Sequence, residues 1–167
     1  MLISLSLLQH IGKKLNELLE IFVGLILFVM LFSIILQVFA RYLFHSSFSW
    51  PEEVAMYLMA WLTFIGGSVA TYRWQHISVD IVSSLFKGKI AIIVHLVTAV
   101  IFSILALFLL VSGTNLVSVS WNVITDALHI PLAYIRASMP IGGAVMAYHC
   151  LVHILSDIDA LLRYGEV

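Results

Sequence analysis

One stretch of the chain decides its fold: residues 21–40 have the sequence IFVGLILFVMLFSIILQVFA, which contains no charged side chain. An α-helix rises about 1.5 Å per residue, so a helix of this length reaches across a hydrocarbon layer about 30 Å thick. A backbone inside lipid must have its hydrogen bonds satisfied, and a helix achieves this within a single segment. The stretch is therefore predicted to be a membrane-spanning helix.

Three further charge-free stretches follow, at residues 54–72, 90–125 and 137–156. The first and the last have the length of a single span, which gives four spans in all. The middle stretch is too long for one upright helix: residues 90–111 are almost wholly apolar, whereas residues 112–125, SGTNLVSVSWNVIT, are rich in Ser, Thr and Asn. We expect a span over 90–111 that either tilts strongly or leaves the membrane through a semi-polar extension to 125.

The composition agrees with a protein that lives in lipid. The 167 residues are 62% hydrophobic and 10% charged, whereas soluble domains are about 45–50% apolar and about 25% charged. Eight Lys and Arg against nine Asp and Glu leave no basic surface for nucleic acid. Cys150 is the single cysteine, which excludes an internal disulfide and a cysteine-based metal cluster. We predict an all-α integral membrane protein that forms one domain, residues 1–167.

Residues 1–20 are predicted to form an amphipathic helix at the membrane interface. Lys13 and Lys14 follow the apolar run instead of preceding it, so the segment is not a cleavable signal peptide. Apolar residues recur every three or four positions, as on one face of a helix. They are Leu5, Leu8, Ile11, Leu15, Leu18 and Phe22. Such a face would lie on lipid while the lysines stay in water.

The basic residues predict the orientation of the spans. Six of the eight fall on one side of this topology and two on the other. The six are Lys13, Lys14, Arg73, Lys87, Lys89 and Arg163, and the two are Arg41 and Arg136. Because Lys and Arg collect on the cytoplasmic side, both termini are expected in the cytoplasm.

The interiors of the four predicted spans contain small residues but no Asp, Glu, Lys or Arg. Membrane-buried charges mark ion and proton pathways, so a self-sufficient ion-coupled transporter is not expected. Thr63, Gly67 and Thr71 repeat every four residues with Gly66 beside them, and residues 142–143 are both glycine. Small residues let helices approach closely, either within this chain or against another membrane subunit, and both can hold.

Three histidines lie in the spans and leave an alternative open. His149 and His153 share one face of the last span, and His95 lies at a similar depth in the third. Neutral imidazole ligates haem, so the chain could be a haem-binding four-helix membrane anchor of a respiratory enzyme. Hydrogen bonding between helices accounts for the same residues without a cofactor, and we expect neither a cofactor nor a metal.

The most specific stretch runs from Gln37 to Asp80. Pro51 suits the first turn of a helix, and Glu52 and Glu53 complement its dipole there. Adjacent carboxylates splay apart on a helix, which does not suit paired acid–base catalysis, so no enzyme is expected. We expect one of the two to face Arg41 inside the protein and the other to face outward.

This stretch resembles the small membrane subunit of tripartite ATP-independent periplasmic (TRAP) transporters, the Q or DctQ-type subunit. The resemblance is carried by an Arg-Tyr before the outer loop, a Trp-x-Glu-Glu and an Arg…His…Asp exit. The candidate interface or anchoring residues are Arg41, Tyr42, Trp50, Glu52, Glu53, Trp61, Gly66, Gly67, Arg73, His76 and Asp80. Pro131 and Pro140 before the last span are also similar to the family.

The resemblance implies a subunit of the bacterial inner membrane without a transport site of its own. A larger membrane subunit would carry the organic acid and sodium, and a soluble periplasmic protein would deliver the acid. The small subunit would act as a scaffold for the larger one and help to seat the binding protein. Dicarboxylates, keto acids and sialic acids are the substrates that this resemblance implies.

Overall fold

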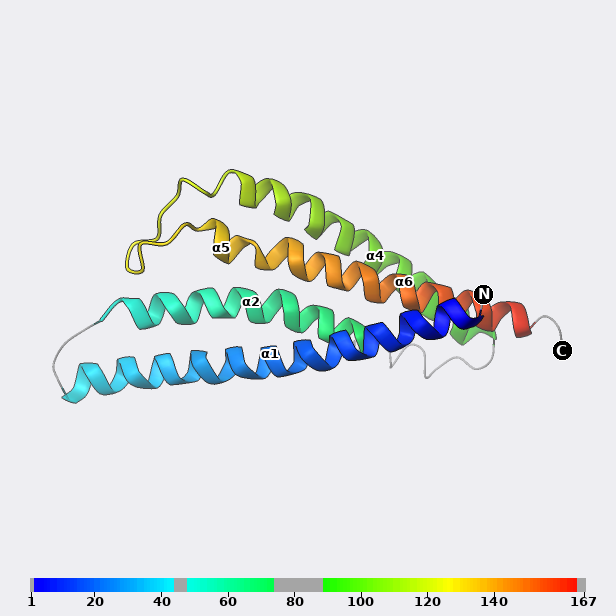
Figure 1. Cartoon of the computed structure of the whole chain (residues 1–167), viewed down its shortest axis with the longest axis horizontal. Coiled ribbons are helices and arrows are strands. Elements are labelled where there is room, and N and C mark those ends of the chain that lie inside the picture. The colour runs from blue at the N-terminus through cyan, green and yellow to red at the C-terminus, as the bar shows by residue number, and fades with distance from the viewer. Residues whose placement is uncertain (1, 44–47, 74–88, 165–167) are drawn as a thin grey trace.

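The computed structural model describes residues 2–43, 48–73 and 89–164. Its helices are α1 (Leu2–Leu43), α2 (Trp50–Tyr72), α4 (Lys89–Ser118), α5 (Ala133–Arg136) and α6 (Ser138–Tyr164) (Figure 1). Four helical segments, α1, α2, α4 and the α5–α6 pair, are long and apolar enough to cross a membrane. The described ranges contain no β-strand. The prediction of an all-α membrane protein with four spans is confirmed.

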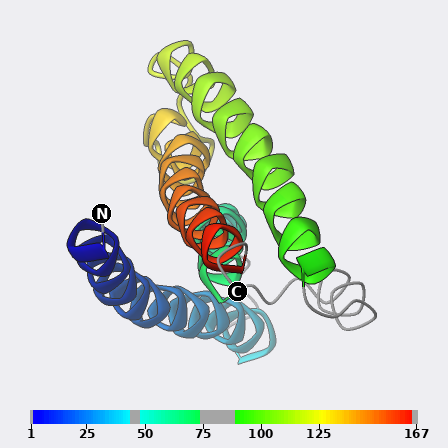
Figure 2. The same cartoon turned by 90° about the vertical axis from the view of Figure 1, so that its right-hand side faces the viewer.

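The long helices form an open row. α2 packs between α1 and α6, and α6 packs in turn against α4. Among the described residues, α4 makes no close backbone contact with α1 or α2. Viewed along the helices, α6 lies in the middle with α1 and α4 at opposite edges (Figure 2). Both termini lie at the same end of the row (Figure 1), as an even number of spans requires.

α1 runs through 42 residues without a break. The N-terminal segment and the first span are therefore one helix rather than two, with no boundary near residue 20. Gly12 and Asn16 are buried, whereas Leu18 and Ile21 are 66% and 69% exposed. The helix thus turns mainly small and polar residues toward its neighbours and many large apolar residues away from the protein. Placement of residues 1–20 at the membrane surface stays a prediction.

Two adjacent glycines allow α6 to lie close to both of its neighbours. A Cβ atom on Gly142 would lie 2.7 Å from the carbonyl oxygen of Phe64 on α2. A Cβ atom on Gly143 would lie 2.9 Å from the amide nitrogen of Leu110 on α4. These distances are shorter than van der Waals contact, so only glycine fits at either position. The prediction that small residues of the last span pack within the chain is confirmed for this pair.

The third charge-free stretch divides into a helix and a loop. α4 ends at Ser118, and residues 119–132 form a loop that leads to α5. The loop closes on itself through an isolated bridge between Ile124 and Pro131, and the Leu132 amide donates to the Val123 carbonyl at 2.8 Å. A single helix through residue 125 is therefore not formed.

Candidate functional site

Glu53 is the best-connected residue of the sequence-predicted cluster. Its side chain is 7% exposed. One carboxylate oxygen, Oε2, accepts hydrogen bonds from the amides of Ala127 at 2.5 Å and Leu128 at 3.1 Å. The other, Oε1, accepts from the hydroxyl of Tyr57, one turn further along α2. The carboxylate therefore ties the first turn of α2 to the loop between α4 and α5.

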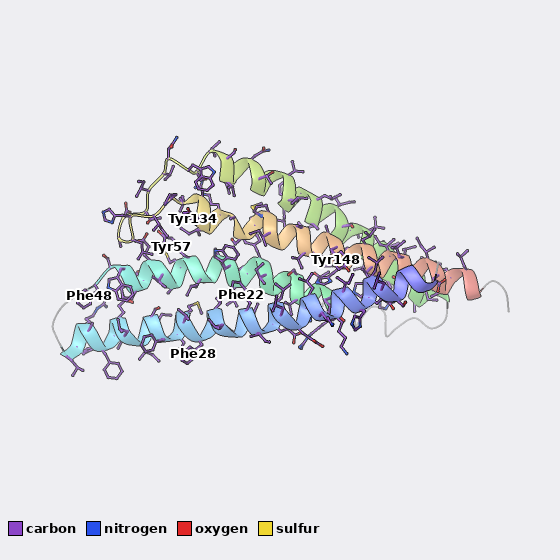
Figure 3. The ribbon with its side chains drawn as sticks, in the orientation of Figure 1. Phe22, Phe28, Phe48, Tyr57, Tyr134 and Tyr148 are labelled. Atoms are coloured by element: carbon purple, nitrogen blue, oxygen red, sulfur yellow. The ribbon has the colours of Figure 1, made fainter. Side chains whose placement is uncertain are left out.

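The loop presents its amides to Glu53 because its own hydrogen bonds fix its shape. The Thr125 amide donates to the Ile130 carbonyl at 3.0 Å, and the Thr125 hydroxyl accepts from the Ile130 amide at 3.1 Å. Between them the chain turns through His129, whose φ of 55° lies in the left-handed region. Tyr57 and Tyr134 lie at this end of the molecule (Figure 3).

Glu52 lies on a different side of α2. It is exposed, and its Oε2 accepts a hydrogen bond from Nε2 of Gln37 on α1 at 3.2 Å. Adjacent residues on a helix are about 100° apart, which separates the two carboxylates. The prediction that one carboxylate faces inward and the other outward is confirmed.

The prediction that one of these carboxylates pairs with Arg41 is wrong. Arg41 is exposed at the end of α1, and among the described residues no salt bridge joins it to Glu52 or Glu53. Glu53 accepts three hydrogen bonds, from Tyr57 and from two amides of the loop, and Glu52 accepts one from Gln37. Both carboxylates therefore have hydrogen-bond partners other than the Arg41 guanidinium. The sequence reasoning missed both Tyr57 and Gln37. Tyr57 stands four residues after Glu53, a helical spacing that could have indicated the contact.

The aromatic residues of the cluster differ in their surroundings. Tyr42 and Trp50 are 76% and 41% exposed at the ends of α1 and α2 that share the side of the loop. Trp61 instead contacts Phe22 on α1, with ring centroids 6.2 Å apart in an edge-on arrangement. Figure 3 shows Phe22 between α1 and α2. Trp61 therefore holds α2 to α1, whereas the other two are placed to meet a lipid interface or a partner.

Gly66 and Gly67 form an open notch on α2. A Cβ atom added to either would meet nothing within 4 Å. Gly113, Gly142 and Gly143 differ, since a Cβ on any of them would collide with a neighbouring helix. Neighbouring helices of the same chain thus pack against the glycines of α4 and α6, whereas, among the described residues, no neighbouring helix packs against the two glycines of α2.

Arg73 joins the other end of α2 to α1. Its Nη2 lies 2.6 Å from Glu20 Oε2 and its Nε donates to Glu20 Oε1 at 2.8 Å, a two-point contact with α1. Hydrogen bonding to Glu20, and the charge of that carboxylate, raise the pKa of the Arg73 guanidinium. Glu20 was not among the predicted residues, although a lone acid just before an apolar span is a visible signal. His76 and Asp80 lie outside the described residues.

The histidines join α6 to its neighbours. His153 Nε2 lies 3.3 Å from the carbonyl oxygen of Tyr72, the last residue of α2. His149 is 1% exposed, and its ring packs between Tyr72 and Tyr148 with centroids 5.1 Å and 5.7 Å away. The hydrogen bond from His153 to Tyr72 is of the kind between helices that the sequence predicted. In the described part of the chain, no group of three or more His, Cys, Asp or Glu could hold a metal ion.

Comparison with known proteins identifies one family. Residues 30–160 match the family described as "Tripartite ATP-independent periplasmic transporters, DctQ component". This range covers most of the chain, including all of α2 and α4 and nearly all of α6.

Individual relatives agree with this match. A putative TRAP transporter small permease protein of Haemophilus influenzae is 25% identical over 96% of this chain and 99% of its own length. The sialic acid TRAP transporter small permease protein SiaQ of Vibrio cholerae is 26% identical over 93% of this chain and 90% of its own. The sialic acid TRAP transporter permease protein SiaT of Haemophilus influenzae is 35% identical over 47% of this chain, and the chain spans only 13% of that protein.

Proposed function

The chain belongs to the DctQ component family of TRAP transporters and is a small permease subunit, and we propose that it is the fixed scaffold of a sodium-coupled importer of an organic acid. It supports a larger permease subunit and helps to seat a periplasmic binding protein. The substrate is a dicarboxylate, a keto acid or a sialic acid. The family consists of transporter subunits and not of enzymes.

The observation that carries this proposal is the open notch of Gly66 and Gly67. Helices associate in lipid where small residues let their backbones approach. Three other glycines of the chain are used in this way by α2, α4 and α6 themselves, whereas this pair faces open space. A helix of the larger subunit packed on the notch would use the glycines in the same manner. We therefore assign this face of α2 to the larger subunit.

Two further features support a scaffold. The interiors of the predicted spans carry no Asp, Glu, Lys or Arg, and coupled transport usually relies on such groups. The chain also aligns with a small part of a much longer permease protein. Such an alignment favours a role beside a large permease rather than alone.

The orientation completes the proposal. With both termini in the cytoplasm of a bacterial inner membrane, Trp50, Glu52 and the loop of residues 119–132 face the periplasm. A binding protein would approach this end. Glu52 is exposed there, while Glu53 keeps the loop in place.

Substitution of the notch tests the proposal. Gly67→Leu should leave the isolated chain folded, because its Cβ meets nothing within 4 Å. Co-purification with the large permease should fall by about tenfold, which corresponds to a loss of roughly 1.4 kcal/mol of binding free energy. The measurement is the amount of large permease that co-purifies with each small subunit from detergent extracts of cells that express both.

Gly24→Leu is the matched control. Gly24 lies on α1 and also has nothing within 4 Å of a Cβ position, so its replacement adds the same bulk to a different surface. It should leave co-purification unchanged. Equal binding of the large permease by wild type and Gly67→Leu would show that the notch is not the contact.

A further inference from the structure

Arg136 places a positive charge at the junction of the loop and α5, where no acid of the described chain neutralises it. Its side chain is half-buried, and Nη1 donates to the hydroxyl of Ser120, near the start of the loop, at 2.6 Å. Among the described residues no carboxylate forms a salt bridge with Arg136. Removal of a charged group from water is costly unless an opposite charge or hydrogen bonds replace its hydration. The arrangement therefore favours an anion from outside the chain.

The Ser120 hydroxyl holds the guanidinium in position. Ser120 is fully buried, and its hydroxyl in turn donates to the carbonyl of Leu116 on α4. Because the hydroxyl proton is used in that bond, the oxygen accepts from Arg136 with a lone pair. A guanidinium carries several N–H donors in a planar fork, which matches the oxygens of a phosphate or a carboxylate. Among the described residues Ser120 is the acceptor that this fork uses, so most of its donors are left for an anion.

Exposed aromatic and aliphatic side chains flank this hydrogen bond. Trp121 follows Ser120 and Tyr134 stands just before Arg136, and the two rings pack edge-on with centroids 5.6 Å apart. They are 51% and 56% exposed, and Val119 on the other side of Ser120 is 70% exposed. Figure 3 shows Tyr134 where the loop meets α5. The surface is therefore amphipathic, with a fixed cation next to exposed aromatic and aliphatic groups.

The place of this surface in the molecule favours a lipid. α4 lies at an edge of the row (Figure 2) and, in the described part of the chain, makes no close backbone contact with α1 or α2. The outer side of α4 is therefore open to the membrane. Trp and Tyr are enriched at the level of the lipid headgroups. A phospholipid presents a phosphate next to apolar chains at that level, so its charge and its apolar part both match this surface.

We infer that Arg136 binds the phosphate of a phospholipid headgroup in the leaflet on the side of the loop. The guanidinium donates to the phosphate oxygens, and Trp121 and Tyr134 pack against the glycerol and the upper part of an acyl chain. A lipid bound here would cover the junction of α5 with the loop that Glu53 holds from α2. The notch on α2 takes no part in this contact, so the lipid site is independent of the proposed scaffold role.

Native mass spectrometry of the purified full-length chain, titrated with dioleoyl phosphatidylglycerol, tests the inference. Arg136→Gln should weaken binding of the first lipid by about tenfold, because the charged fork is lost. Arg41→Gln is the matched control: it removes the same charge from an exposed position at the same end of the molecule, and should change binding by less than about twofold. Dioleoylglycerol, which lacks the phosphate, should bind the wild-type chain at least about tenfold more weakly than the phospholipid.

Ser120→Ala keeps the charge and removes the buried hydroxyl that positions it, so binding should weaken by about threefold. If Arg136→Gln fails to fold, this variant decides, and unchanged binding in it would overturn the inference. Wild-type affinity for phosphatidylglycerol in a folded Arg136→Gln chain would do the same, as would equal binding of dioleoylglycerol and the phospholipid. Loss of large-permease capture by Arg136→Gln with unchanged lipid binding would instead assign the guanidinium to a carboxylate of the partner subunit.

Discussion

Glu53 holds three hydrogen-bond donors that come from two distant parts of the chain. Tyr57 lies one turn away on α2, whereas Ala127 and Leu128 lie more than seventy residues later in the loop. Hydrogen bonds to an ionised carboxylate are stronger than bonds between neutral groups. Removal of such an acceptor leaves buried donors without partners, which destabilises a protein.

Replacement of each carboxylate by its amide should therefore have unequal effects. Glu53→Gln keeps one acceptor oxygen for the two loop amides but removes the negative charge, so the charge-assisted hydrogen bonds become weaker neutral ones and the thermal midpoint of the purified chain should fall. Glu52→Gln should change it little, because Glu52 is exposed and bonds only Gln37 at 3.2 Å. Thermal unfolding of both variants in the same detergent, followed by far-UV circular dichroism, measures the difference. Equal midpoints for the two variants would contradict the role assigned to Glu53.

At this scale the sequence identified the two carboxylates, missed Tyr57 and Gln37, and predicted one wrong contact. Pro51 and the two acids correctly marked the start of α2, because the preferences of a first helical turn are local. The Arg41 pair was wrong because the true partners of Glu53 include backbone amides of a loop. A backbone amide leaves no mark in a sequence, so this contact could not have been found from composition or spacing.

Among the helices, α6 carries the closest contacts of the fold. Its neighbours approach through Gly142 on the α2 side and Gly143 on the α4 side. Met146 and Cys150 continue the α4 contact one and two turns later and are buried together with Ala106. The two glycines therefore set the spacing of three helices at once.

Gly142→Ala should push α2 and α6 apart, because the new Cβ would lie 2.7 Å from a backbone oxygen that cannot rotate away. Overpacking of this kind costs about 1–3 kcal/mol, and the thermal midpoint should fall accordingly. Gly24→Ala is the control, since its Cβ meets nothing within 4 Å. A Gly142→Ala protein as stable as the Gly24→Ala protein would show that the crossing is looser than described.

The helices were the easiest part to predict, because long gaps between charges are a direct consequence of lipid as a solvent. The ends of the helices were harder. Nothing in the pattern at residues 17–22 separates a surface helix from a span that simply begins earlier, and α1 is continuous there. The turn at Ser118 was equally hidden, because residues 112–125 are uncharged on both sides of it.

At the scale of the whole molecule, the row of helices leaves two edges and the face of α2 uncovered. Among the described residues, α4 does not close the row against α1. The row could not be distinguished from a closed bundle by sequence, because apolar stripes do not show whether lipid, another subunit or the same chain covers them. An open row of helices exposes more side surface than a closed bundle, and the membrane-spanning helices of a partner subunit could pack along it.

The orientation of the row gives a further prediction. On the six-to-two distribution of basic residues, both termini lie in the cytoplasm. A reporter enzyme that is active only in the periplasm should be silent when fused after Val167 and active when fused after Ser47. A reporter enzyme active only in the cytoplasm should give the reverse pattern. Activity of the periplasmic reporter after Val167 would invert the molecule and place the Glu53 loop inside the cell.

Uptake of an organic acid into liposomes under an inward sodium gradient tests the scaffold role most directly. The account predicts no uptake with this chain alone, because the interiors of its predicted spans have no Asp, Glu, Lys or Arg for coupling. Uptake should appear only when the large permease and the binding protein are added to the same vesicles. Sodium-dependent accumulation of the acid by this chain alone would contradict the account.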